Sequence, residues 1–374
     1  MSNDEPQRLP KARIMSIDAL RGFTMFWIIG GGIVFRNLGQ IFNHPVTAFM
    51  GRQLKHVKWL GFHFQDLIMP LFIFVMGAVV PFSIFKRLEQ GQSRRRIHLH
   101  IVKRTAVLYL LGVLIGSGGL HFNWPEMDWV GVLHRIGVCY FFAALLVMHT
   151  KWQTQAIVTA AILLLYWAAL TLVPVPGHGA GVITPAGCLP AYIDQQLLPG
   201  KISEDFYGYG DSNGILPTLV SVSTALLGVL TGHWLRSNRP GNHKVAGLAL
   251  AGLISLFIGY AWGQVFPIIR LLWTSSMVLF TAGLSLLLLT LFYWLIDVRG
   301  YKKWAFFFIV IGANPITIYV LQSIVEFTAI AELFVIGIIQ YVEPLKQLIL
   351  PLAALTVKWL FLWFLYRRKI FLRV

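Results

Sequence analysis

Long apolar runs recur along the whole chain, and they constrain its fold more than any other feature. Each run approaches the roughly 20 residues that a helix needs to cross the hydrocarbon core of a bilayer. Only 12% of the 374 residues are charged and 57% are hydrophobic, whereas a soluble domain carries roughly 25% charged residues. This composition excludes an ordinary soluble protein and predicts an all-α, polytopic membrane helical bundle.

We expect about ten transmembrane helices. The apolar segments lie at about 16–37, 63–86, 101–120, 130–149, 154–174, 215–236, 245–263, 270–296, 304–324 and 347–366. A further stretch at 330–342 is too short for an easy span, so it is expected to form a half-helix or an interfacial helix. The predicted domain organisation is a cytoplasmic tail at 1–13 followed by a single transmembrane domain at 14–374.

The basic residues predict the orientation of the bundle. Most of the 31 Lys and Arg residues fall in the N-terminal tail, the C-terminal tail and connections that ten spans would put on one side. The positive-inside rule therefore predicts that both termini are cytoplasmic. The same rule explains the net charge of +16 without a nucleic-acid partner, which we do not expect. The long connections 38–62 and 175–214 then lie outside.

The cysteines indicate neither a disulfide-stabilised fold nor a metal site. The two cysteines, Cys139 and Cys188, form no disulfide framework and belong to no metal-binding motif. We therefore expect no metal centre.

Charged residues inside predicted spans are candidates for functional sites, because a charge in hydrocarbon is costly. Asp18 and Arg21 are three residues apart and share a helix face. They suit either a local ion pair with helix capping or an anion site where Arg21 meets phosphate. His134 and Arg135 are neighbours near a helix end. Arg135 is expected in a buried polar network, either catalytic or structural.

Two further pairs of residues, His56 with Asp66 and Asn314 with Pro315, each allow two interpretations. Asp66 follows His56 by ten residues, and a carboxylate beside an imidazole can orient the ring as a base. A loop histidine at a membrane mouth is also often a plain surface residue. Asn314 precedes Pro315, so this span contains either a packing kink or a polar group that faces a cavity.

Seven motifs in register resemble one family, the membrane heparan-α-glucosaminide N-acetyltransferases. They are RIMSIDALRG (13–22), HVKWLG (56–61) with DLIMPLFIFVMG (66–77), GVLHRIGVCY (131–140), DSNGIL (211–216), LWTSS (272–276), DVRG (297–300) and NPITIYV (314–320). The resemblance covers nearly the whole chain.

The resemblance implies a transferase that takes acetyl from cytosolic acetyl-CoA and passes it to the amine of a glucosamine-type sugar or glycan on the far side. It implies that His56 is the active histidine, which accepts the acetyl group or deprotonates the amine, and that Asp66 orients it. Asp18, Arg21 and Arg135 are then candidates for binding CoA. The candidates for the sugar and thioester cavity are Trp59, Asp211, Trp273, Ser275 and Asn314. Homodimers are common in the family, so a homodimer is a further expectation.

A second function stays open on the same residues. The chain resembles a bacterial branch associated with N-acetylglucosamine use, which implies the inner (cytoplasmic) membrane. In the segment WIIGGG (27–32), Ile28 and Ile29 stand where the lysosomal family member has an Asn-Tyr pair. This departure and the proline in the ninth segment favour the alternative, a transporter of N-acetylglucosamine or a related sugar.

Overall fold

Helices account for nearly all the regular structure in the computed structural model, which describes residues 14–42, 44–118, 127–200, 202–342 and 345–372. The predicted tail at 1–13 lies outside the described residues. The elements are α1 (Met15–Phe26), η1 (Trp27–Gly31), α2 (Gly32–Ile41), α3 (Pro45–Gln53), η2 (Phe64–Leu67), α4 (Ile68–Glu89), α5 (Arg94–Gly116), α6 (Val132–His149), α7 (Trp152–Leu172), α8 (Leu189–Leu197), η4 (Glu204–Phe206), α9 (Ile215–Arg236), α10 (Gly241–Gly263), α11 (Ser275–Tyr293), η5 (Trp294–Val298), α12 (Phe306–Ala313), α13 (Pro315–Leu321), α14 (Phe327–Ile339) and α15 (Lys346–Arg367).

The prediction of a polytopic helical membrane bundle is confirmed. Within the described ranges, nine helices are long and apolar enough to cross a membrane. The ninth predicted segment, 304–324, consists of two short helices, α12 and α13, which are separated at Asn314 because Pro315 has no N–H to continue the ladder. The short stretch predicted at 330–342 corresponds to α14, which is 13 residues long.

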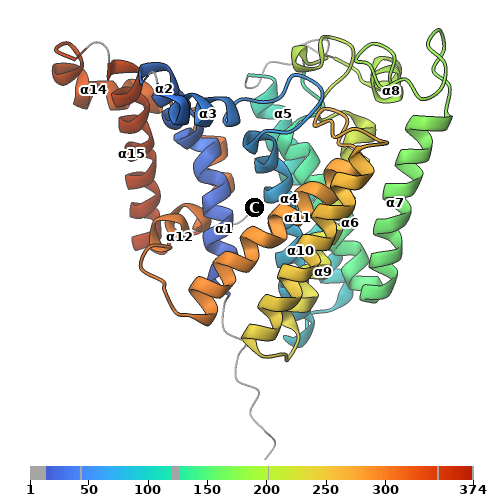
Figure 1. The fold of residues 1–374 in the computed structure, drawn as a ribbon. Coiled ribbons are helices and arrows are strands. Elements are labelled where there is room, and N and C mark those ends of the chain that lie inside the picture. The colour runs from blue at the N-terminus through green and yellow to red at the C-terminus, as the bar shows by residue number, and fades with distance from the viewer. Residues whose placement is uncertain (1–13, 43, 119–126, 201, 343–344, 373–374) are drawn as a thin grey trace, which may run out of the picture.

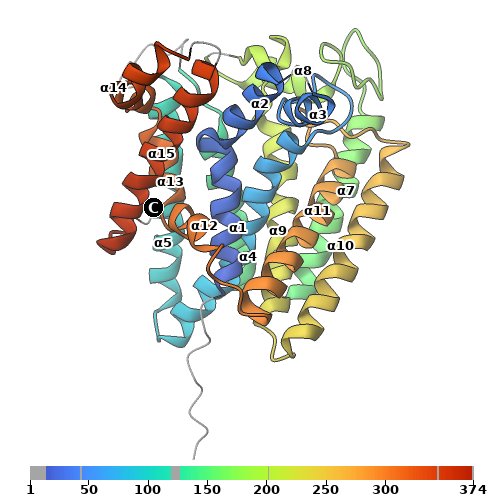
Figure 2. The ribbon, with the colours of Figure 1, turned by 60° about the vertical axis from the view of Figure 1, so that its left-hand side comes forward.

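The two ends of the bundle differ in construction (Figures 1 and 2). The short helices α3, α8 and α14 and the longest connections gather at one end, which we call the α8 end. Short connections between α4 and α5, α6 and α7, and α9 and α10 lie at the opposite end, where α1 begins. The long connections therefore converge on a single face, where a site can be built.

The helices α4 and α9 lie in the centre of the bundle, whereas α5 and α10 lie at its rim. In the most apolar window of each span, 72% of α4 is buried, compared with 17% for α5 and for α10. Lipid is as apolar as a leucine side chain, so central helices gain stability through close packing rather than through the hydrophobic effect. Glycines allow this approach between α4 and α9, because a Cβ at Gly77 would lie 2.0 Å from the Ala225 carbonyl oxygen and one at Gly228 would lie 2.0 Å from that of Phe74.

The first span changes from an α-helix to a π-helical turn about half-way along its length. The helix winds into a π-turn at Trp27–Gly31, where Gly30 has φ +150°, a conformation that favours glycine. Lys358 of α15 reaches this turn and donates from Nζ to the Ile29 carbonyl at 2.7 Å. The glycines of WIIGGG therefore shape the backbone of this span close to the α8 end.

Close packing of α4 against α9 leads to a stability prediction. We expect Gly228→Ala to lower the free energy of unfolding by about 1–3 kcal/mol, because the added methyl must force two backbones apart. The measurement is the thermal unfolding midpoint in detergent. Gly337→Ala is the matched control, since a Cβ there meets no atom within 4 Å. Equal midpoints for the two variants would contradict this account.

Candidate functional site

The segment HVKWLG crosses the α8 end in an extended form and is fixed by three contacts. Leu60 forms an isolated antiparallel bridge with Ile269, and the Gly61 N–H donates to the Ile268 carbonyl at 3.1 Å. The Trp59 indole donates from Nε1 to the Ile183 carbonyl at 3.0 Å. Two other connections, one containing Ile183 and one containing Ile268 and Ile269, thereby hold the segment in place.

His56 and Asp66 form a close pair. The distance between His56 Nδ1 and Asp66 Oδ1 is 2.6 Å, and Asp66 lies in η2 directly before α4. The other carboxylate oxygen, Oδ2, accepts hydrogen bonds from the His63 N–H at 3.0 Å and the Val57 N–H at 3.4 Å. The Asp66 side chain is fully buried, whereas that of His56 is 48% exposed. The carboxylate is therefore fixed and the imidazole is accessible.

Arg270 completes this group. Its Nε lies 3.2 Å from Asp66 Oδ1, so a guanidinium faces the buried carboxylate. Burial lowers the pKa of Arg270 while the Asp66 charge opposes that change. When His56 carries its proton on Nδ1, Asp66 Oδ1 accepts the hydrogen bond from Nδ1–H, and the Nε2 lone pair is free to act as a base or nucleophile. Arg270 was not among the predicted site residues, because the Leu60–Ile269 bridge that brings it to Asp66 joins distant parts of the chain.

Two unpaired polar atoms lie next to this group. Within the described residues, Trp27 Nε1 and Gln65 Oε1 are buried and have no hydrogen-bond partner. Gln65 precedes Asp66, and the Trp27 ring packs against Phe64 at a centroid distance of 5.1 Å. A buried donor and a buried acceptor without partners cost about 1–3 kcal/mol each, so both are suited to bind a ligand.

Arg135, Asp211 and Trp273 gather in a second group. The Arg135 guanidinium carbon lies 4.3 Å from the centroid of the Trp273 ring, and the side chain also donates to the Ser212 carbonyl. The Trp273 indole donates to Thr224 Oγ1 at 3.1 Å. Asp211 accepts from the Asn213 N–H at 2.7 Å, and burial raises its pKa. This arrangement matches the buried polar network that was predicted for Arg135.

Asp194 orders the turn that carries Asp211. Its two carboxylate oxygens accept from the Asp211 N–H at 3.1 Å and from the Ile215 N–H at 3.0 Å, at the start of α9. Burial raises the pKa of Asp194 to about 6. This capping carboxylate was not among the predicted site residues, because it lies 21 residues before Ile215 and no local signal links it to the start of α9.

The other predicted residues lie apart from His56. Asp18 pairs with Arg21 at 2.8 Å, and Arg21 Nε donates to the Gly312 carbonyl at 2.8 Å, at the break between α12 and α13. Asn314 bonds to the backbone of the C-terminal segment, through Ile370 at 3.0 Å and Leu372 at 2.9 Å. Ser275 donates to the Leu163 carbonyl at 2.7 Å. Binding roles for these residues stay predictions.

In the part of the chain that the structure describes, no group of three or more His, Cys, Asp or Glu side chains is arranged to hold a metal ion.

Comparisons with known proteins agree with the motifs. Residues 13–178 match the family model described as "Domain of unknown function (DUF5009)". The chain is 27% identical to the human protein named "Heparan-alpha-glucosaminide N-acetyltransferase" over 418 residues, which cover 97% of this chain and 60% of the human protein. The mouse protein of the same name is 26% identical over 380 residues, which cover 86% of this chain and 55% of the relative.

This chain is a homologue of those acetyltransferases. The resemblance predicted from the motifs is thereby confirmed, although the bacterial branch stays a prediction. The chain spans a little over half the length of these relatives. Neither relative is named as a carrier, so the sugar-transport alternative gains no support from the comparisons.

The raised pKa of Asp194 predicts a pH-dependent stability. The folded pKa of about 6 exceeds the unfolded value of about 3.9. The folded state therefore binds this proton more tightly, and the stability it contributes is present below about pH 4 and lost as pH rises through 6. We expect Asp194→Asn to reduce the gain in thermal midpoint on acidification from pH 7 to pH 5.

The matched control for this measurement is Glu332→Gln in α14, whose carboxyl lies outside this cluster. It is expected to keep the wild-type pH dependence. An unchanged pH dependence in Asp194→Asn would contradict the assignment.

Proposed function

We propose that this protein is a transmembrane acetyltransferase that moves acetyl from cytosolic acetyl-CoA to the amine of a glucosamine-type sugar on the other face of the membrane. The observation that carries the proposal is the His56–Asp66 pair, with 2.6 Å between Nδ1 and Oδ1 and an accessible imidazole. The names of the human and mouse relatives support the same chemistry.

His56 would act through Nε2. Asp66 holds the proton of Nδ1 and stabilises the imidazolium that forms when Nε2 takes up a proton. In one route Nε2 removes the proton of the attacking amine, the new C–N bond forms, the thioester C–S bond breaks and the sulfur leaves as thiolate. In the other route Nε2 attacks the thioester and the C–S bond breaks with loss of the thiolate. The amine then attacks the acetyl-imidazole, the bond to the imidazole breaks, and Nε2 takes up the amine proton. Both routes need the imidazole to be oriented by Asp66.

The donor side of the site fits an arm with amide groups. Acetyl-CoA supplies an acyl group activated as a thioester, on a pantetheine arm that carries amide donors and acceptors. Trp27 Nε1 can donate to such an amide carbonyl and Gln65 Oε1 can accept from its N–H, and both lie buried without a partner in the described residues. Arg21 of α1 is a candidate for the anionic nucleotide end, whereas Arg135 lies at the α8 end, where it donates to the Ser212 carbonyl.

The distribution of charge supports the direction of transfer. The connections at the end opposite to α8 carry Arg94, Arg95, Arg96, Arg239, Lys302 and Lys303. By the positive-inside rule this end faces the cytoplasm, with both termini inside. The resemblance to a bacterial branch is the ground for proposing the inner membrane as its location. His56 and the long connections would then meet the acceptor on the outer face.

Acetyl transfer by purified, reconstituted protein tests the function. With labelled acetyl-CoA and glucosamine, we expect N-acetylglucosamine to form, and His56→Ala to lower the rate about 100-fold or more. Asp66→Asn is expected to lower the rate at least about tenfold, because the carboxylate no longer fixes the ring. His178→Ala, an exposed histidine at the same end of the bundle, is the matched control. Equal rates for wild type and His56→Ala would refute the proposal.

A second measurement tests the donor contacts. We expect Gln65→Leu to raise the KM for acetyl-CoA about three- to tenfold, as for the loss of one hydrogen bond, with a smaller change in kcat. Gln264→Leu is the control, because that side chain is exposed at the same end. If both variants leave this KM unchanged, Gln65 has no part in donor binding.

A further inference from the structure

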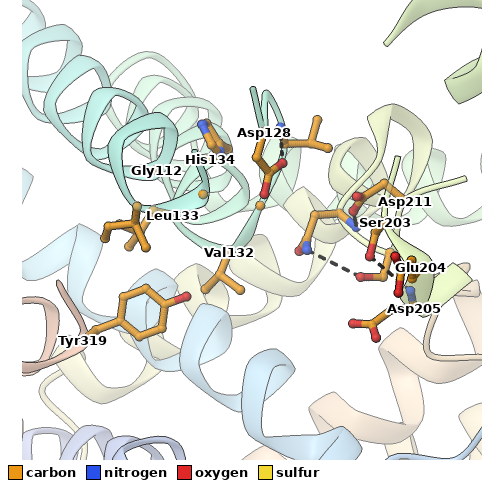
Figure 3. A pocket seen from close by; sticks show the side chains of 16 residues that line it. Gly112, Asp128, Val132, Leu133, His134, Ser203, Glu204, Asp205, Asp211 and Tyr319 are labelled. Atoms are coloured by element: carbon orange, nitrogen blue, oxygen red, sulfur yellow. Dashed lines mark hydrogen bonds between the residues drawn. The ribbon is translucent and has the colours of Figure 1, made fainter. Parts of the chain in front are cut away.

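Two hollows lie along α5, and they differ in chemistry. The first is an acidic cavity of about 440 Å³ at the α8 end. Its carboxyl groups come from the α5–α6 connection and from the loop 202–214, and they are those of Asp128, Glu204, Asp205 and Asp211 (Figure 3). The same loop packs Phe206 against Trp59 of HVKWLG, with ring centroids 5.3 Å apart. The second hollow, of about 370 Å³, lies half-way along α5 and is apolar.

The apolar hollow opens between α5 and α6 at the rim of the bundle. Its walls are Val102, Thr105, Ala106, Tyr109 and Leu110 of α5 and Phe141 of α6. Only 17% of the most apolar window of α5 is buried, and Figure 2 shows this helix at the outside of the bundle. The Tyr109 hydroxyl already donates to the Trp129 carbonyl at 3.1 Å. The hollow therefore suits a hydrocarbon chain better than a polar ligand.

The first three turns of α5, at the end opposite to α8, are strongly basic. The basic residues there are Arg94, Arg95, Arg96, His98, His100, Lys103 and Arg104. At that end of the described chain, Asp18 pairs with Arg21, Glu89 pairs with Arg236, and Asp297 accepts from backbone N–H groups at the start of α1. The ion pairs between described residues include none of the basic residues of α5. The start of α5 therefore carries positive charge that these acidic groups do not balance.

One face of α5 joins this basic start to the apolar hollow. Its residues recur at spacings of three and four, which places them on one side of a helix. They are Arg96, Leu99, Lys103, Ala106 and Leu110, and all are exposed. Leu99 is 68% and Leu110 is 67% exposed, as suits a lipid-facing surface. Long side chains lean toward the N-terminus of their helix, so the Lys103 ammonium lies between the hollow and the basic start.

The charge of this face decides between two possible occupants. A second copy of the chain, related by a two-fold axis through this face, would set identical residues against one another. Arg96 and Lys103 would then oppose the same positive charges. An anionic phospholipid instead joins a phosphate to hydrocarbon chains, in the same order as the basic and apolar parts of this face. Clusters of Lys and Arg at the end of a spanning helix are typical of such lipid contacts.

We infer that this face of α5 binds an anionic phospholipid from the leaflet at the end opposite to α8. Lys103 pairs with the lipid phosphate, and Arg96 adds to the positive field that attracts it. One acyl chain enters the apolar hollow between α5 and α6. The inference does not depend on acetyl transfer, because it concerns a rim surface that contains no residue of the His56 group.

Lipid binding to purified, delipidated full-length protein tests this inference. The protein in detergent is titrated with dioleoylphosphatidylglycerol or dioleoylphosphatidylcholine, and native mass spectrometry gives the Kd of the first bound lipid. We expect the anionic lipid to bind at least about tenfold more tightly, since each nearby Lys or Arg contributes about 1 kcal/mol, or about fivefold. Soluble glycerol 3-phosphate is expected to bind far more weakly, because it has no acyl chain.

Variants separate the headgroup contact from the chain contact. Arg96→Gln with Lys103→Gln should remove the preference for the anionic lipid. The matched control, Lys302→Gln with Lys303→Gln, removes two exposed charges from the same end of the bundle and should keep that preference. Ala106→Phe fills the hollow and should weaken both lipids at least about threefold. Ala251→Phe, at an exposed alanine of the rim helix α10, should not.

The inference would be overturned by equal Kd values for the two lipids in the wild type, or by wild-type Kd values in both the charge variant and Ala106→Phe. Glycerol 3-phosphate that binds as tightly as the lipid would overturn it as well, since the hollow would then have no part. A dimer that Ala106→Phe converts to a monomer would show that a second copy covers this face instead. All of the substituted side chains are exposed, so each variant is expected to fold.

Discussion

Backbone carbonyls freed at two helix breaks determine how this bundle is held together. Lipid offers no hydrogen-bond donor, so each carbonyl inside the bundle needs one from the protein. At the π-turn of the first span, Lys358 of α15 donates to Ile29. At the break between α12 and α13, Arg21 of α1 donates to Gly312. Two charged residues within the spans, Lys358 and Arg21, thereby join α1, α12 and α15. These hydrogen bonds explain why charged side chains are present inside apolar segments.

The irregular backbone also positions the residues of the group formed by His56, Asp66 and Arg270. The π-turn carries Trp27 to the side of Phe64, and residues 64–67 form the short helix η2 that contains Asp66. Asp66 is then held by two backbone N–H groups and by Arg270, while His56 stays accessible. The proposed acyl transfer benefits from a carboxylate that is held rigidly beside an accessible imidazole. These groups then need little rearrangement when the transition state forms.

Local patterns in the sequence predicted the spans well and the long-range contacts poorly. Nine of the apolar segments correspond to helices of the described chain that are long enough to cross a membrane. The start of α5 lies earlier than expected because its first turns are basic. The segment 270–296 begins as a loop, where Trp273 adopts φ +51°, and helix α11 starts at Ser275. Motif order identified His56 and Asp66, whereas Arg270 reaches Asp66 through contacts between distant segments that spacing does not encode.

The loop 202–214 has one face on Trp59 and another in the acidic cavity. Substitutions on its two faces therefore share a structural element, and their free-energy effects should not add as those of distant residues do. Selection acting on the cavity would also act on the surroundings of His56. Single replacements on either face of this loop would accordingly tend to disturb the segment that carries His56 as well, whereas paired substitutions across the loop could compensate one another.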